Sequence, residues 1–82
     1  MNDKVYILLD VVDGKTNRVV KTMRKTHGVV TVEALEGPPD VILVMEAADR
    51  QRLAKIAVQA LTLVGKMAER IQLLPINAKY TR

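Results

Sequence analysis

The chain has 82 residues, no cysteine, and 13 basic residues against nine acidic ones. This length allows one domain, and a domain so small hides only about 60 to 65% of the surface that its unfolded chain exposes. Without disulfides or a cluster of metal ligands, association with another subunit is the remaining common route to stability. No apolar run approaches the roughly 20 residues of a membrane span, and no signal sequence opens the chain. We therefore expect a cytoplasmic location.

The positive charge is spread over several segments, which is typical of solvated helix surfaces. The basic residues in question are Arg18, Lys21, Arg24, Lys25, Arg50, Arg52, Lys55, Lys79 and Arg82. Tyr6 and Tyr80 are the only aromatic residues, whereas sheet-type RNA readers need several aromatic rings on which bases stack. We expect neither an RNA-recognition module nor sequence-specific binding of nucleic acid.

The first half of the chain predicts a strand, a helix and a second strand. Residues 5–12 form a nearly unbroken apolar run, which is typical of a central strand covered on both faces. A helix is expected over residues 15–25 and ends before Gly28. Residues 29–35 alternate, with Val30, Val32 and Ala34 expected on one face; this mixed polarity indicates an edge strand.

The second half repeats the pattern in the order strand, helix, strand. Residues 41–45 are apolar throughout and predict a second central strand. Residues 47–64 carry apolar side chains at helical spacing, and Gly65 closes this amphipathic helix. Alternation returns over residues 67–74, which predicts the second edge strand.

The order β-α-β-β-α-β is that of an α+β, ferredoxin-like domain. Two apolar strands inside and two amphipathic strands outside predict an antiparallel four-stranded sheet of order 4-1-3-2. Right-handed crossovers would put both helices on one face. Because both central strands are apolar on alternate residues of each face, the uncovered face would expose a large apolar patch. We expect a second copy to cover it, sheet on sheet, in a two-fold homodimer.

Several features in this order resemble the effector-binding domain of Lrp/AsnC-type transcriptional regulators, the RAM module, which is similar in fold to ACT domains. They are the apolar opening strand, the pair Gly28-Val29, the turn from Gly37 to Asp40 before an apolar strand, and the close at Gly65. The resemblance covers about residues 4–76 and leaves a short tail, 77–82, of a single domain spanning 1–82.

The resemblance implies a stand-alone module, because full-length members place a helix-turn-helix domain before this one and only three residues precede the first strand here. Such a module is expected to bind a small molecule, typically an amino acid, without reading DNA. Two positions depart from the family pattern. Pro39 stands where an aromatic residue is common, and Lys66 follows Gly65 in place of the usual valine.

We predict that the ligand binds between subunits near the two glycine turns, which are expected to lie close together at one end of the sheet. The candidate ligand-binding residues are Gly28, Val29, Gly37, Pro38, Pro39 and Asp40. Asp40 can hold a ligand ammonium group, or can be a turn residue that binds nearby backbone amides. The glycines can let backbone amides approach a ligand carboxylate, or can supply unusual dihedral angles only.

The sequence predicts no catalytic residue, metal site or cofactor. His27 is explained by its place after a helix C-terminus, and Asp10 and Asp13 have no nucleophile or metal ligand nearby. Besides a small-molecule effector, the expected partners are a second copy, with an octameric or decameric ring as an extension, and a full-length Lrp-type regulator. An interaction protein that co-assembles with such a regulator is the alternative function. A small enzyme of the dimeric α/β-barrel group is a third.

Overall fold

A computed structural model describes residues 2–76; the expected tail, 77–82, lies outside the described residues. The elements follow the expected order: β1 (Asp3–Val11), α1 (Thr16–Arg24), β2 (Val29–Ala34), β3 (Val41–Ala47), α2 (Arg50–Val64) and β4 (Ala68–Ile76). They form one antiparallel sheet of order β2-β3-β1-β4. Read from the opposite edge, this is the predicted order 4-1-3-2. The α+β, ferredoxin-like fold is thereby confirmed.

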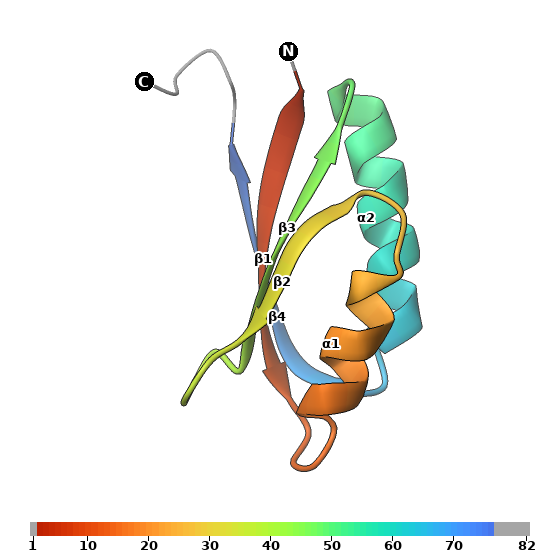
Figure 1. The fold of residues 1–82 in the computed structure, drawn as a ribbon. Coiled ribbons are helices and arrows are strands. Elements are labelled where there is room, and N and C mark those ends of the chain that lie inside the picture. Colours follow the sequence, from red (N-terminus) through yellow and green to blue (C-terminus); the bar gives the residue numbers. More distant parts are fainter. Residues whose placement is uncertain (1, 77–82) are drawn as a thin grey trace.

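Both helices lie on the same side of the sheet (Figure 1). Burial therefore alternates along the two central strands: every second residue of β1 and β3 is fully enclosed under the helices, and the residues between them are partly exposed. The enclosed strand residues are Val5, Ile7, Leu9, Val11, Val41, Leu43 and Met45. The core thus lies between the sheet and the helix layer. The opposite face of the sheet, called the open face below, has no cover from the described residues.

The second helix begins three residues later than the pattern predicts. Asp49 is its N-cap, and the side chain accepts a hydrogen bond from the Arg52 amide at 2.8 Å. Ala47 still belongs to β3, where it pairs with Asp3. An apolar period alone cannot separate the end of a buried strand from the start of a helix, whereas the cap residue marks the boundary.

Strict alternation fails at the start of β2. The expectation that Val30 lies on the same face as Val32 and Ala34 is therefore wrong. The register of β2 against β3 shifts between Val29 and Thr31. Val29 lies opposite Met45 and packs on the core, while Val30 is 56% exposed. A bulge of this kind adds one residue to a strand and reverses the side on which the preceding residues point.

The last strand lies at the edge of the sheet and extends further than expected, to Ile76. Pro75 pairs opposite Val5 in this extension, and a proline is tolerated there because an edge strand leaves one row of backbone groups unpaired. Within residues 2–76, neither helix has the length and apolarity that a membrane crossing needs.

Candidate functional site

Asp40 ties the β2–β3 hairpin to the end of β1. Its carboxylate oxygen Oδ2 accepts a hydrogen bond from the Val11 amide at 2.7 Å. Its backbone amide donates to the Leu9 carbonyl at 2.8 Å, and its carbonyl accepts from the Leu35 amide at 2.7 Å. The amide that binds the carboxylate is thus not a neighbour in the turn but a residue of the central strand. The other oxygen, Oδ1, accepts no hydrogen bond from the described residues.

The turn of the hairpin begins at Gly37 and continues through two prolines. Gly37 has φ +84°, in the left-handed region, and nothing lies within 4 Å of the position that a Cβ would occupy. The peptide bond between Pro38 and Pro39 is cis. Gly37 therefore serves the turn through its backbone freedom, and the space around it is open to solvent.

A hollow of about 180 Å³ lies on the open face beside the two prolines. It is lined by Leu8, Asp10, Pro38, Pro39, Arg70 and Gln72. Asp10 and Arg70 are paired residues of β1 and β4, and Arg70 Nε lies 3.9 Å from Asp10 Oδ2. The Arg70 side chain is 79% exposed and that of Asp10 is 28% exposed, so both charges are accessible to a ligand.

Gly28 and Val29 lie away from the hairpin, and the expected proximity of the two turns is wrong within one protomer. Gly28 directly precedes the first residue of β2, whereas Gly37 lies three residues after its last residue, Ala34. Six extended residues separate the two ends by about 20 Å. The two glycine turns therefore belong to opposite ends of the same edge strand (Figure 1).

The backbone conformation, with a contribution from packing, explains why position 28 is a glycine. Its φ is +90°, and a Cβ there would collide with Ile56 Cδ1 of α2. Its carbonyl accepts a hydrogen bond from the Glu46 amide at 2.9 Å. Val29 donates to the Thr26 carbonyl at 3.2 Å and packs on the core. These contacts link the end of α1 to the sheet.

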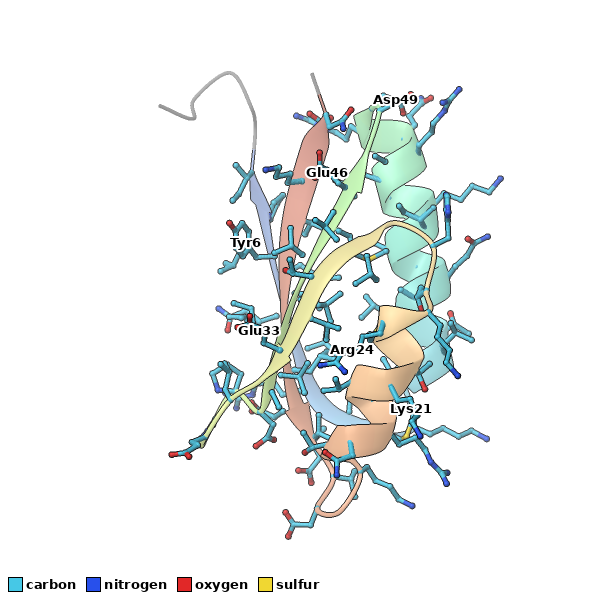
Figure 2. The ribbon with its side chains drawn as sticks, in the orientation of Figure 1. Tyr6, Lys21, Arg24, Glu33, Glu46 and Asp49 are labelled. Atoms are coloured by element: carbon cyan, nitrogen blue, oxygen red, sulfur yellow. The ribbon has the colours of Figure 1, made fainter. Side chains whose placement is uncertain are left out.

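The open face has an apolar centre between charged ends. Tyr6, Leu8, Ile42, Val44 and Leu74 form the centre; they adjoin one another in the strand register, and Leu74 is 45% exposed. The cross-strand pairs Lys4–Glu46 and Asp10–Arg70 lie at the two ends. Figure 2 shows the Tyr6 and Glu33 side chains on this side of the sheet, away from the helices. An apolar centre with a polar rim is the usual anatomy of a protein interface.

The sequence analysis did not identify Arg70 as a candidate, and it considered Asp10 only as a catalytic residue or metal ligand. The signal was the presence of one carboxylate and one guanidinium on neighbouring strands. It becomes readable only when the register of β1 against β4 is known, and that register shifts at Asp10 and Val11.

Of the six predicted residues, Pro38 and Pro39 line the hollow, Gly37 and Asp40 hold the hairpin beside it, and Gly28 and Val29 lie elsewhere.

No protein-family model and no curated protein sequence matches this chain. Solved structures do match it. PH0061 superposes with a TM-score of 0.84 at 17% identity, over 99% of this chain and 54% of that one. TTHA0845 from Thermus thermophilus superposes with a TM-score of 0.81 at 18% identity, over 98% of this chain and 99% of that one.

Two transcriptional regulators share the same fold over about half of their length. An AsnC family regulator from Agrobacterium tumefaciens has a TM-score of 0.77 at 10% identity, over 99% of this chain and 54% of that one. The regulator NMB0573 from Neisseria meningitidis, solved as a complex with L-Met, has a TM-score of 0.70 at 18% identity, over 98% and 53%. The expected resemblance to the effector domain of Lrp/AsnC-type regulators is thus confirmed at the level of the fold.

Proposed function

We propose that this chain is a cytoplasmic Lrp/AsnC-type effector-binding module, not an enzyme, that dimerises and binds an amino acid without reading DNA itself. The fold shared with a regulator solved in complex with L-Met supports the ligand class. TTHA0845 is matched over nearly its whole length, so this fold also occurs as a chain of one such module. The ligand site is the hollow beside the β2–β3 hairpin.

One observation carries this assignment: Asp10 and Arg70 place opposite charges side by side in the hollow. A free amino acid is a zwitterion. The Asp10 carboxylate can accept hydrogen bonds from the ligand ammonium group, and the Arg70 guanidinium can donate two parallel hydrogen bonds to the ligand carboxylate. Pro38 and Pro39 form one wall against which an apolar side chain can pack.

Gly37 and Asp40 act in this proposal by holding that wall. Asp40 is bound to the end of β1 through the Val11 amide, one residue from Asp10, so the hairpin and the charged pair are positioned together. The free oxygen of Asp40 can add an acceptor for the ligand. Gly28 and Val29 can contribute only from another subunit, since they lie at the far end of β2.

Dimerisation through the open face completes the site in the proposal. The hollow opens on the same face as the apolar centre, and Leu8 belongs to both. A partner sheet over this face would close the hollow from above and exclude water from the charged pair, which strengthens its contacts with a ligand. Octameric or decameric rings of such dimers are compatible with the remaining free edges.

An interaction protein that co-assembles with a full-length Lrp-type regulator is the second candidate. It is favoured by the exposed apolar centre of the open face, which such a partner could cover in place of a second copy. The two candidates differ in whether an amino acid binds.

A thermal-shift screen of the purified chain against the twenty amino acids tests the proposal. We expect a rise in melting temperature with a subset of them, because a ligand that binds the folded state alone stabilises it. The absence of any response would contradict the amino-acid module and favour the interaction protein.

Calorimetry on variants then tests the site. Arg70→Gln removes the donor fork and is expected to weaken the best ligand by roughly ten- to a hundredfold, the effect of losing one charge-assisted contact. Asp10→Asn is expected to act similarly on the ammonium group. Arg24→Gln and Asp13→Asn are the matched controls on exposed positions outside the hollow and should leave the affinity unchanged. Equal affinities in all four variants would remove the charged pair from the site.

A further inference from the structure

A groove between α1 and α2 runs along the helix layer. Its lining combines the apolar side chains of Ile56 and Leu63 with the basic side chains of Arg18, Lys21 and Lys25, and its volume is about 490 Å³. Leu63 is 57% exposed. Two apolar side chains thus remain in contact with water beside three cations.

The groove continues past His27 into a second hollow of about 460 Å³. The two hollows share His27, Ile56 and Gln59 as lining residues, and the second adds the basic residues Arg52 and Lys55 together with one carboxylate, Glu46. The combined volume suits a segment of polypeptide better than a single ion.

The charges of this groove are not balanced within the helix layer. Neither α1 nor α2 contains an aspartate or glutamate. Lys21 follows Arg18 by three residues and precedes Lys25 by four, and like charges at these helical spacings repel. The ion pairs found in residues 2–76 are Arg52–Asp49 and Arg70–Asp10, so the cations that α1 contributes to the groove have no carboxylate within pairing distance there.

The helix dipole accounts for only part of this arrangement. It favours cations near a helix C-terminus, where Lys21 and Lys25 lie. It disfavours Arg18 in the first turn of α1. Figure 2 shows Lys21 on the side of α1 that faces away from the sheet, so its charge does not face the core.

We propose that the groove between α1 and α2 binds an acidic segment of a partner protein that also carries a large apolar side chain. Carboxylates of the segment would pair with the cations of α1, and its apolar side chain would cover Leu63 and Ile56. Nucleic acid fits less well, because phosphates would leave both apolar side chains uncovered and the groove offers no Phe, Tyr or Trp ring for base stacking. This surface lies on the helix layer and is separate from the hollow at the hairpin.

The first test uses a labelled synthetic peptide of glutamates with a leucine at every fourth position. Its binding to the full chain is followed by fluorescence anisotropy, and we expect binding that weakens as salt rises. An all-glutamate peptide should bind about fivefold more weakly because it cannot cover Leu63. A peptide with lysine in place of glutamate should not bind.

Matched variants locate the binding surface. Lys21→Glu reverses one charge in the groove and should weaken the leucine-containing peptide about tenfold or more. Arg24→Glu makes the same change on the same helix outside the groove and should have little effect. On α2, Leu63→Ala should weaken binding about fivefold, whereas Val58→Ala, at a side chain 64% exposed outside the groove, should not.

Two results would overturn the proposal. Equal losses in Lys21→Glu and Arg24→Glu would mean that affinity follows net charge and not the groove. Tighter binding of a random-sequence DNA duplex, lost in the same variants, would assign the surface to nucleic acid. Circular dichroism verifies the folding of each variant, and Lys25→Glu replaces Lys21→Glu if the latter is unfolded. Because the peptide assay uses no amino-acid ligand, its outcome is independent of the proposed effector site.

Discussion

Gly28 combines a left-handed backbone with a close neighbour, and the two constraints can be separated by mutation. Gly28→Ala forces an L side chain into φ +90° and against Ile56 Cδ1. Gly37→Ala imposes only the first constraint, because nothing lies within 4 Å of that position. We expect Gly37→Ala to cost about 1 to 2 kcal/mol of unfolding free energy and Gly28→Ala to cost more.

The matching double variant isolates the steric part. Ile56→Val removes the Cδ1 atom that a Cβ at position 28 would meet. In this background Gly28→Ala should cost about 1 kcal/mol less than in the wild type, as expected for residues in contact. Urea denaturation measures all four proteins, and strict additivity of the two changes would contradict the contact.

Asp40 has a structural role that precedes any role in binding. Asp40→Ala leaves the Val11 amide without its acceptor, and we expect a loss of about 1 to 3 kcal/mol of unfolding free energy with the fold retained. Asp40→Asn keeps an acceptor oxygen and should lose less. Asp13→Ala, in an exposed turn, is the control. Thermal denaturation showing the same stability for Asp40→Ala and Asp13→Ala would contradict this role.

The sequence alone identifies the glycines and the aspartate as candidate turn or site residues. It does not identify the long-range contacts that each of them makes. The αL backbone of Gly37 is readable from a Gly-Pro-Pro-Asp turn. The long-range partner of Asp40 is not, since Val11 lies 29 residues away. The charged pair of Asp10 and Arg70 likewise depends on strand register, which local patterns do not specify.

Most of the element pattern could be predicted, because the apolar period changes clearly between strand and helix. The strand order followed from comparing how apolar each strand is. Two of the errors concern where an element ends and how regular it is: Ala47 stays in β3, and a bulge interrupts β2 at Val29 and Val30. Bulges are set by pairing with a neighbouring strand and have no reliable local signal.

Two neighbouring leucines of β1 test the assignment of the faces. Leu9 is 0% exposed under the helices, so Leu9→Asp buries a carboxylate and should unfold so small a domain. Leu8 lies on the open face, so Leu8→Asp should stay folded and become monomeric. Circular dichroism and sedimentation velocity distinguish the two outcomes. A folded wild-type monomer at micromolar concentration, unchanged by Leu8→Asp, would contradict the dimer.

The molecule as a whole presents two surfaces of different character. The open face is apolar at its centre with charged pairs at its ends, which suits a second sheet. The helix layer is basic and has a groove of mixed apolar and positive character. A module that binds a small molecule on one side and a partner on the other could link the two events, since binding at one surface alters affinity at another when both favour the same assembly.

The location of a bound amino acid is the measurement that tests the account most directly. The ¹⁵N-labelled chain is titrated with the amino acid that raises the melting temperature most, and backbone amide shifts are followed by NMR. The account predicts that the largest changes at saturation fall on Asp10, Gly37, Asp40 and Arg70. Changes concentrated on His27 and Ile56 in the helix groove, or no changes at any ligand concentration, would contradict it.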